Sequence, residues 1–322
     1  MRTEAFRRSA AGLRRVDWPP VALFLAVAYA GAWLVTLPAW LAPRHLDEPW
    51  AVVIPPAMMF TPALGVLVAV GLIRRGPRSA RELGLTFGSS FRRCLPYLLF
   101  GWLAMPAMTL AAPFVGVLFG LYHSDLAHLS GFRADLTAGG GAAPPLPVGL
   151  LALIGLAAIP ITTLVPQAIL AFGEELGWRG YLLPRLLPAG QWAALVLSGA
   201  AWGLWHAPII LLGYKYPSHP RLGVLAMLGT AIVGGVLFGW LRLSTNSIWP
   251  SVLGHGAVNA ASAAILLFRR AGTSPDPALV GIDGVTGWLL PLAVVALLVA
   301  LHRLPVATVP ATTEPAPAPA EP

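Results

Sequence analysis

Apolar runs long enough to cross a membrane recur along this chain of 322 residues. A bilayer-crossing helix needs about 20 consecutive, mostly apolar residues, because its backbone amides must find their hydrogen bonds within the segment. Eight runs satisfy this length, at 20–41, 50–73, 94–121, 148–187, 191–213, 222–242, 248–268 and 286–302. The sequence therefore predicts an all-α polytopic membrane bundle of about eight transmembrane helices.

Composition agrees with a membrane location. Charged residues make up 11% of the chain and hydrophobic residues 57%, whereas about a quarter of the residues of a soluble domain are charged. The net charge of +8 is spread over short loops between apolar runs, which is typical of orientation in a lipid bilayer. We therefore exclude nucleic acid as a partner. The single Cys94 rules out an intramolecular disulfide and a cysteine-based metal cluster.

Three regions follow from the distribution of charge and proline. Residues 1–18 form a basic cytoplasmic tail, 19–304 the helical bundle, and 305–322 a disordered Pro/Ala-rich tail. The first apolar run is too long for a signal peptide and is expected to remain as a span. The amino tail and the loops on its side carry 14 Lys and Arg residues, against 6 on the other side. We expect a multi-pass protein of the plasma membrane with both termini in the cytoplasm.

The fourth run, 148–187, is too long for one straight span, and Pro160 and Pro166 predict a kink, a tilt or a re-entrant part within it. Its second half contains Glu174 and Glu175, the only two of the chain's 13 acidic residues inside a predicted span. One charge at this depth costs at least ~2.5–3.5 kcal/mol. Glu175 can pair with Arg179 at i+4. Glu174 points about 100° away from that pair and is free for chemistry.

Two of the seven histidines, His206 and His255, also fall inside apolar runs. Trp202, four residues before His206, can cover its ring, and Asn259 follows His255 by one helical turn. If the fourth and fifth helices turn near 187–191, Glu174 and His206 each lie about 15 residues from the bend and at similar depth. Spacing therefore predicts that Glu174 and His206 converge. His255 lies only about 8 residues beyond the next cytoplasmic turn and reaches the same depth only if the hairpin of the fourth and fifth helices protrudes into the cytoplasm. The site is expected among helices 4, 5 and 7.

This set of groups suits the hydrolysis of an amide. A carboxylate beside a histidine can take a proton from water, and a second histidine with an amide can donate hydrogen bonds to an oxyanion. Two histidines and a carboxylate are also a possible zinc set, although the helical H-E-x-x-H pattern is absent. A serine or cysteine nucleophile is poorly supported, since there is no G-x-S-x-G and Cys94 has no basic partner near it in sequence.

Three motifs together resemble a known family. Glu174-Glu175-x-x-x-Arg179, the aromatic segment Trp202-x-x-x-His206, and His255-x-x-x-Asn259 are similar to those of the CAAX protease and bacteriocin-processing (CPBP, or Abi) family. This family of intramembrane endopeptidases includes the type II CAAX prenyl endopeptidases. The resemblance covers about 165–262, the motif core of the bundle. One departure is visible, because Trp202 stands where the family usually has Phe.

The resemblance implies a role for each residue. Glu174 and His206 would activate water, and His255 and Asn259 would hold the oxyanion. The supporting residues would be Glu175, Arg179 and Trp202. Because hydrogen-bonding roles occupy all four catalytic residues, we favour a site without metal or other cofactor. If the enzyme uses zinc, the ligands would be Glu174, His206 and His255.

The expected partners are a membrane-associated peptide or protein substrate and the lipid bilayer. Some members of the family cut after a prenylated cysteine and others are linked to bacteriocin maturation, so the sequence leaves the substrate open. The alternative function is that of a non-catalytic transporter or scaffold. A transporter should show repeated halves and further intramembrane polar positions, and this chain shows neither.

Overall fold

Apolar helices account for nearly all of the regular structure in the computed structural model, which describes residues 15–72, 79–138 and 146–306. Within these residues no strand is formed, and the one β-bridge joins Ser124 to Arg269. The all-α prediction is confirmed. The predicted tails lie mostly outside the described residues, and nothing here tests the proposed division into tails and bundle.

The described helices follow one another along the chain in this order. The first half contains α2 (Trp18–Leu41), α3 (Ile54–Met59), α4 (Thr61–Leu72), α5 (Phe91–Leu99), α6 (Met105–Leu118), α7 (Ser130–Thr137) and α8 (Val148–Thr162). The second half contains α9 (Ala168–Glu175), α10 (Leu183–Leu186), α11 (Gln191–Trp205), α12 (Ala207–Ile210), α13 (Pro220–Thr245), α14 (Trp249–Ala261), α15 (Ala264–Leu267) and α16 (Leu289–Ala300).

Six helical stretches of the described chain are long and apolar enough to cross a membrane. They are Trp18–Leu41, Phe91–Leu118, Val148–Ala189, Gln191–Ile210, Pro220–Thr245 and Trp249–Leu267. A seventh span arises if the stretch Pro49–Met59 and α4, which meet at an angle of 40°, are taken together. The eighth predicted run corresponds to the shorter α16, of 12 residues. The prediction of about eight membrane helices is therefore confirmed.

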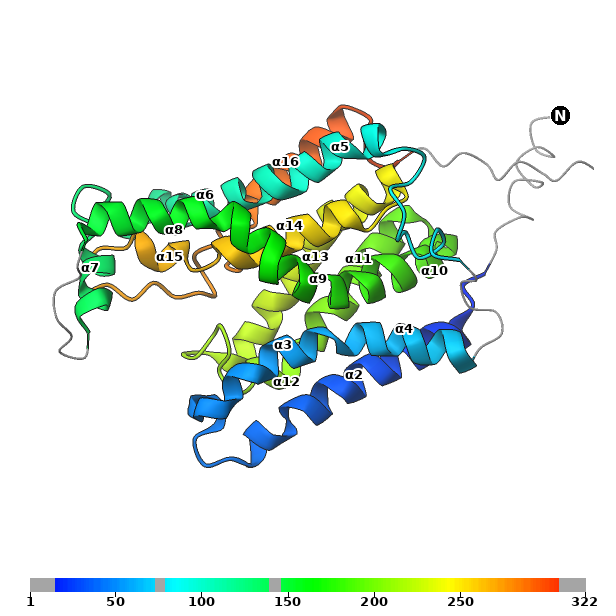
Figure 1. Ribbon diagram of the computed structural model, residues 1–322, viewed down its shortest axis with the longest axis horizontal. Helices are drawn as coiled ribbons and strands as arrows, with labels where there is room; N and C mark the ends of the chain where they lie inside the picture. Colours follow the sequence, from blue (N-terminus) through cyan, green and yellow to red (C-terminus); the bar gives the residue numbers. More distant parts are fainter. Residues whose placement is uncertain (1–14, 73–78, 139–145, 307–322) are drawn as a thin grey trace, which may run out of the picture.

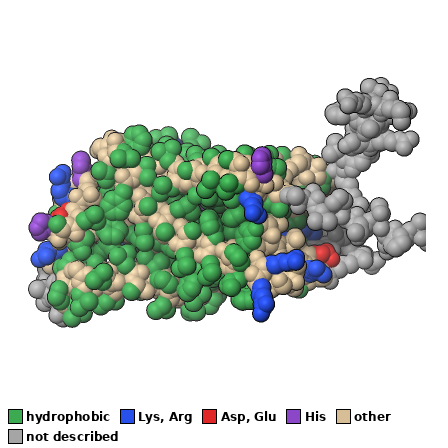
Figure 2. All heavy atoms as spheres, turned by 90° about the horizontal axis from the view of Figure 1, so that it is seen from above, with side chains coloured by type: hydrophobic (Ala, Val, Ile, Leu, Met, Phe, Trp, Pro, Cys, Tyr) green, Lys and Arg blue, Asp and Glu red, His purple; other side chains and the backbone are tan. Residues whose placement is uncertain are grey.

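The outer surface matches a position in a bilayer. Figure 2 shows one long face covered by hydrophobic side chains, with Lys, Arg and His side chains gathered toward its two ends. Large apolar side chains are exposed along several of the helices, including Leu67 on α4 and Leu153 on α8. Because such exposure in water would carry a large free-energy cost, this surface fits contact with lipid.

The bundle is layered around α11, α13 and α14 (Figure 1). On one side of them lie α2 and α4, and on the other side lie α5, α6, α8 and α16. Glycine brings the backbones of α11 and α13 together, since a Cβ atom at Gly199 would stand 2.8 Å from the carbonyl oxygen of Ala231. Close packing without side chains is a common way for membrane helices to associate.

The fourth predicted span is broken where its prolines lie. A π-helical turn at Thr163–Gln167 separates α8 from α9, and within it Val165 has the non-helical angles φ −146° and ψ 120°. The prediction of a kink near Pro160 and Pro166 is therefore correct. Past the break, α9 runs into the middle of the bundle (Figure 1). The carboxylate doublet at the end of α9 is thereby carried into the interior.

Candidate active site

The doublet Glu174-Glu175 ends α9 and is almost completely buried, with exposed fractions of 2% and 0%. Glycines on both sides of it allow α9 and the following turn to lie against α3 and α4. A Cβ atom at Gly173 would stand 2.6 Å from the carbonyl oxygen of Met59, and one at Gly177 would stand 2.5 Å from Cβ of Pro62. Any larger side chain at these two positions would push the carboxylates out of place.

Glu175 contacts two side chains, those of Arg179 and His255. Its Oε1 accepts a hydrogen bond from Nη1 of Arg179 at 2.9 Å and lies 2.9 Å from Nδ1 of His255. All three side chains are buried. The guanidinium of Arg179 also lies over the ring of Trp202, 4.5 Å from its centroid, which is a cation–π arrangement. This carboxylate is therefore engaged in holding the site together.

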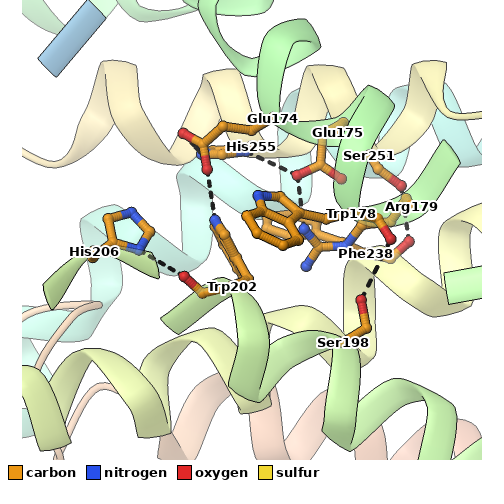
Figure 3. A network of polar contacts seen from close by, with 10 residues as sticks. All are labelled: Glu174, Glu175, Trp178, Arg179, Ser198, Trp202, His206, Phe238, Ser251 and His255. Atoms are coloured by element: carbon orange, nitrogen blue, oxygen red, sulfur yellow. Dashed lines mark hydrogen bonds and ion pairs between the residues drawn. The ribbon is translucent and has the colours of Figure 1, made fainter. Parts of the chain in front are cut away.

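Glu174 has a different set of neighbours (Figure 3). Its Oε2 accepts a hydrogen bond of 2.6 Å from the indole Nε1 of Trp202, and its Oε1 lies 3.9 Å from Nε2 of His255. The sequence identified Trp202 only as an aromatic cover and missed this hydrogen bond. The indole N–H of a buried tryptophan usually donates to a nearby acceptor. The residue type alone could therefore have suggested a hydrogen bond from Trp202. One oxygen of Glu174 is thus fixed while the other remains without a short contact.

His206 follows the last residue of α11 and is half-buried. Its Nδ1 lies 3.0 Å from the carbonyl oxygen of Trp202. Since a carbonyl only accepts, Nδ1 must carry the hydrogen, which leaves Nε2 to exchange a proton with a ligand. The ring packs against Trp205, at 4.8 Å between centroids, and against Trp202, at 5.9 Å. The predicted cover of His206 by Trp202 is present.

His255 comes from α14 and is clamped between two aromatic rings. Its centroid lies 5.2 Å from that of Trp202 and 5.8 Å from that of Phe238, which stacks on it at an interplanar angle of 20°. Nδ1 is occupied by Glu175, so Nε2 is the nitrogen left for a ligand. Asn259 lies one turn further along α14 and is half-buried. Within the described chain, its side-chain amide has no hydrogen-bond partner.

One cavity of about 280 Å³ joins these residues. Glu174, His206, His255 and Asn259, the four predicted catalytic residues, all line it. No direct contact between Glu174 and His206 is present, so they can act together only on something held between them. The volume accommodates several waters or a short stretch of peptide, since one water takes about 30 Å³ of liquid.

A second cavity of about 70 Å³ adjoins the first and shares His206, His255 and Asn259 with it. Its remaining walls are mostly apolar, from α6, α13 and α16, and include Met105, Val233 and Trp288. Lys215, in the loop after α12, also lines both cavities. Sequence reasoning counted this lysine only as a loop charge. No local pattern marks it, because the cavity is formed by segments far apart in sequence.

The alternative zinc set does not fit this arrangement. In the described part of the chain, no three His, Cys, Asp or Glu side chains are grouped so that they could hold a metal ion. Glu174 Oε1 and His255 Nε2 are 3.9 Å apart, whereas two ligands about 2.0–2.1 Å from one tetrahedral zinc would stand roughly 3.3–3.5 Å apart. Glu174 also uses its other oxygen to bind Trp202.

Comparison with known families agrees with the motifs. Residues 156–261 match the family described as Type II CAAX prenyl endopeptidase Rce1-like. This segment contains every predicted site residue, from the carboxylate doublet to Asn259, and corresponds closely to the motif core of 165–262. The resemblance to the CAAX protease and bacteriocin-processing family that the motifs predicted is confirmed over this segment. A search among curated proteins found no match.

Proposed function

We propose that this protein, a multi-pass membrane protein with a CAAX protease core, hydrolyses a peptide bond of a membrane-associated substrate. One observation carries the proposal: Glu174, His206, His255 and Asn259 line a single cavity inside an apolar helical bundle. The match to an endopeptidase family over residues 156–261 supports the same activity. A transporter or scaffold remains the alternative function, but the sequence lacks the repeated halves expected of a transporter.

Water is activated between Glu174 and His206. Oε2 of Glu174 binds the indole of Trp202, and Nδ1 of His206 binds the backbone carbonyl of Trp202. Each side chain therefore has one other atom, Oε1 or Nε2, left for a ligand. A water bound between Oε1 of Glu174 and Nε2 of His206 can lose a proton to the carboxylate as its oxygen attacks the substrate carbonyl. The proton then passes to the leaving amine. Trp202 orients both groups, since its indole holds the carboxylate and its backbone holds the imidazole.

The oxyanion that forms on the substrate is stabilised by Asn259 and His255. The amide of Asn259 donates in any protonation state, and no other described residue competes for it. Since Nδ1 of His255 faces Glu175, this ring donates through Nε2 only when both of its nitrogens carry a hydrogen. Preorganised donors in a dry site supply much of the rate enhancement of acyl-transfer enzymes.

Glu175 and Arg179 support the site without touching the substrate. Glu175 orients His255 through Nδ1 and keeps Arg179 neutralised at the centre of the bundle. Neither of them lines the cavity. We propose that the pair holds α9, α13 and α14 in register, because the guanidinium also lies over the rings of Trp202 and Phe238.

The test is a peptidase assay on purified protein. Wild type and Glu174→Ala are incubated with a library of membrane-associated peptides, including prenylated ones because of the family match, and products are identified by mass. Asp47→Asn, which removes an exposed carboxylate outside the cavity, is the matched control. Cleavage by wild type and the control but not by Glu174→Ala is expected. Absence of cleavage across the library would favour the scaffold alternative.

We propose further that hydrolysis proceeds without a metal ion. Elemental analysis of active protein is expected to find much less than one zinc per chain. One tightly held zinc per active chain, lost on His206→Ala, would overturn this part of the proposal.

A further inference from the structure

Lys215 brings a positive charge to the wall of the catalytic cavity. It lies in the loop between α12 and α13, and its side chain is 26% exposed. It lines both adjoining cavities, together with His206 and Asn259. Among the described residues that line either cavity, it is the only Lys or Arg.

The ammonium of Lys215 has N–H donors that no acceptor in the described chain uses. Its Nζ donates to Oδ2 of Asp283 at 2.6 Å, and within the described chain this carboxylate is its only acceptor. An ammonium has three N–H donors, so two remain for a ligand. Burial is the largest single influence and lowers the pKa of Lys215. The charge and hydrogen bond of Asp283, with smaller contributions from Tyr214 and Glu174, together outweigh it and raise the pKa above its usual value. The side chain is therefore cationic at neutral pH.

Asp283 is itself fixed in place, which holds Lys215 at the cavity. The backbone oxygen of Asp283 accepts hydrogen bonds of 2.9 Å from the hydroxyls of Tyr216 and Thr230. The indole of Trp288 donates to the same Thr230 hydroxyl at 2.9 Å. The ammonium is thus preorganised, and a ligand would not have to pay the full entropy of ordering a long lysine side chain.

From these contacts we infer that Lys215 is a carboxylate-binding subsite that selects anionic peptides for the proposed peptidase. The inference rests on the proposed function for its biological role. The smaller of the two cavities that Lys215 lines has largely apolar walls, which include Met227, Ile282 and Trp288. An apolar peptide with one carboxylate, at its C-terminus or on an acidic side chain, would complement an ammonium in an apolar cavity. A neutral peptide would leave the two N–H donors unpaired at a site from which it displaces water.

The rival explanation is that the Lys215–Asp283 pair only ties the loop after α12 to the segment before α16. The two explanations differ in the effect of removing Asp283. A structural tie is broken equally by Lys215→Met and by Asp283→Asn. A subsite loses its ligand when the lysine is removed but gains affinity when the competing carboxylate is neutralised. Asp283→Asn leaves the backbone oxygen to Tyr216 and Thr230, so the loop keeps those hydrogen bonds.

Binding to the full-length Glu174→Gln protein in detergent tests the inference without requiring cleavage. The probes are an acetylated apolar tripeptide with a free α-carboxylate, its C-terminal amide, and the same amide with one Glu side chain. At least one carboxylate peptide is expected to bind about tenfold or more tightly than the neutral amide. Comparison of the two carboxylate probes tells the chain terminus from an acidic side chain.

Variants in the same background decide between the explanations. Lys215→Met is expected to abolish the carboxylate preference, Lys215→Arg to keep it, and Asp283→Asn to increase it. Equal affinity for all three probes, no binding of either carboxylate probe, or the same effect of Lys215→Met and Asp283→Asn would overturn the subsite. These experiments measure binding and do not require cleavage. Failure of the carboxylate subsite and failure of the proposed peptidase activity can therefore be told apart.

Discussion

Neutralising Glu175 is predicted to destabilise the protein far more than neutralising its neighbour Glu174. One oxygen of Glu175, Oε1, faces both Arg179 and His255 at 2.9 Å. In Glu175→Gln an amide oxygen can take its place, but the negative charge that balances the guanidinium is lost. The new NH2 group would also enter a buried position, because Oε2 of Glu175 has no hydrogen-bond partner in the described structure. The substitution thus strands a buried cation and adds an unpaired donor.

The size of the effect follows from the burial of the pair. Glu175 and Arg179 are exposed by 0% and 1%. Removal of one member of such a pair costs about 3–5 kcal/mol, because the remaining charge stays buried without compensation. Cation–π contacts of Arg179 with Trp202 and Phe238 offset part of this cost, by about 1–2 kcal/mol at most. A net loss of roughly 1–4 kcal/mol is expected.

The assay is unfolding of purified protein in detergent, followed by tryptophan fluorescence or by thermal melting. Glu174→Gln is the matched control, since its amide oxygen can still accept from Trp202 and no buried cation depends on it at short distance. The control should melt close to wild type, and Glu175→Gln should melt well below both. Equal stability of the two variants would refute the division of roles within the doublet.

Three further substitutions probe the site and the topology. Asn259→Ala should lower turnover by roughly 10²–10³, the usual effect of removing one oxyanion donor; a change of less than about tenfold in turnover of the purified variant would count against that role. Trp202→Phe keeps an aromatic cover but removes the indole donor to Glu174, and should slow turnover about tenfold without unfolding the protein; wild-type turnover would show that the hydrogen bond is dispensable. A cysteine placed at the exposed Ser79 should react with a membrane-impermeant reagent only after cells are opened, because the arginine-rich loop is predicted to be cytoplasmic; labelling of intact cells would reverse the topology.

Much of the bundle could be predicted from the sequence, because a helix that crosses a bilayer needs about 20 mostly apolar residues. Run length and apolar content predicted the membrane helices, and charge spacing predicted the buried Glu175–Arg179 pair, which is present at 2.9 Å. Proline positions predicted the break before α9. The direction in which α9 leaves that break is set by packing against α3 and α4, so the sequence could not give the depth of the doublet.

Contacts between distant segments were the part that the sequence could not supply. Lys215 meets Asp283 across 68 positions, and no spacing rule links a loop lysine with a loop aspartate. The hydrogen bond from Trp202 to Glu174 joins α11 to α9, and aromatic residues in membrane helices are usually core or interfacial. The roles of the four cavity residues remain predictions.

Glu174→Gln is the most direct test of the central claim, that this carboxylate activates water for peptide hydrolysis. The measurement is the single-turnover rate of wild type and variant on one cleaved peptide, with thermal melting of both samples as the check on folding. Glutamine preserves size and the acceptor for Trp202 but removes the base. A folded variant with no detectable cleavage is predicted. Turnover near that of wild type would contradict the mechanism.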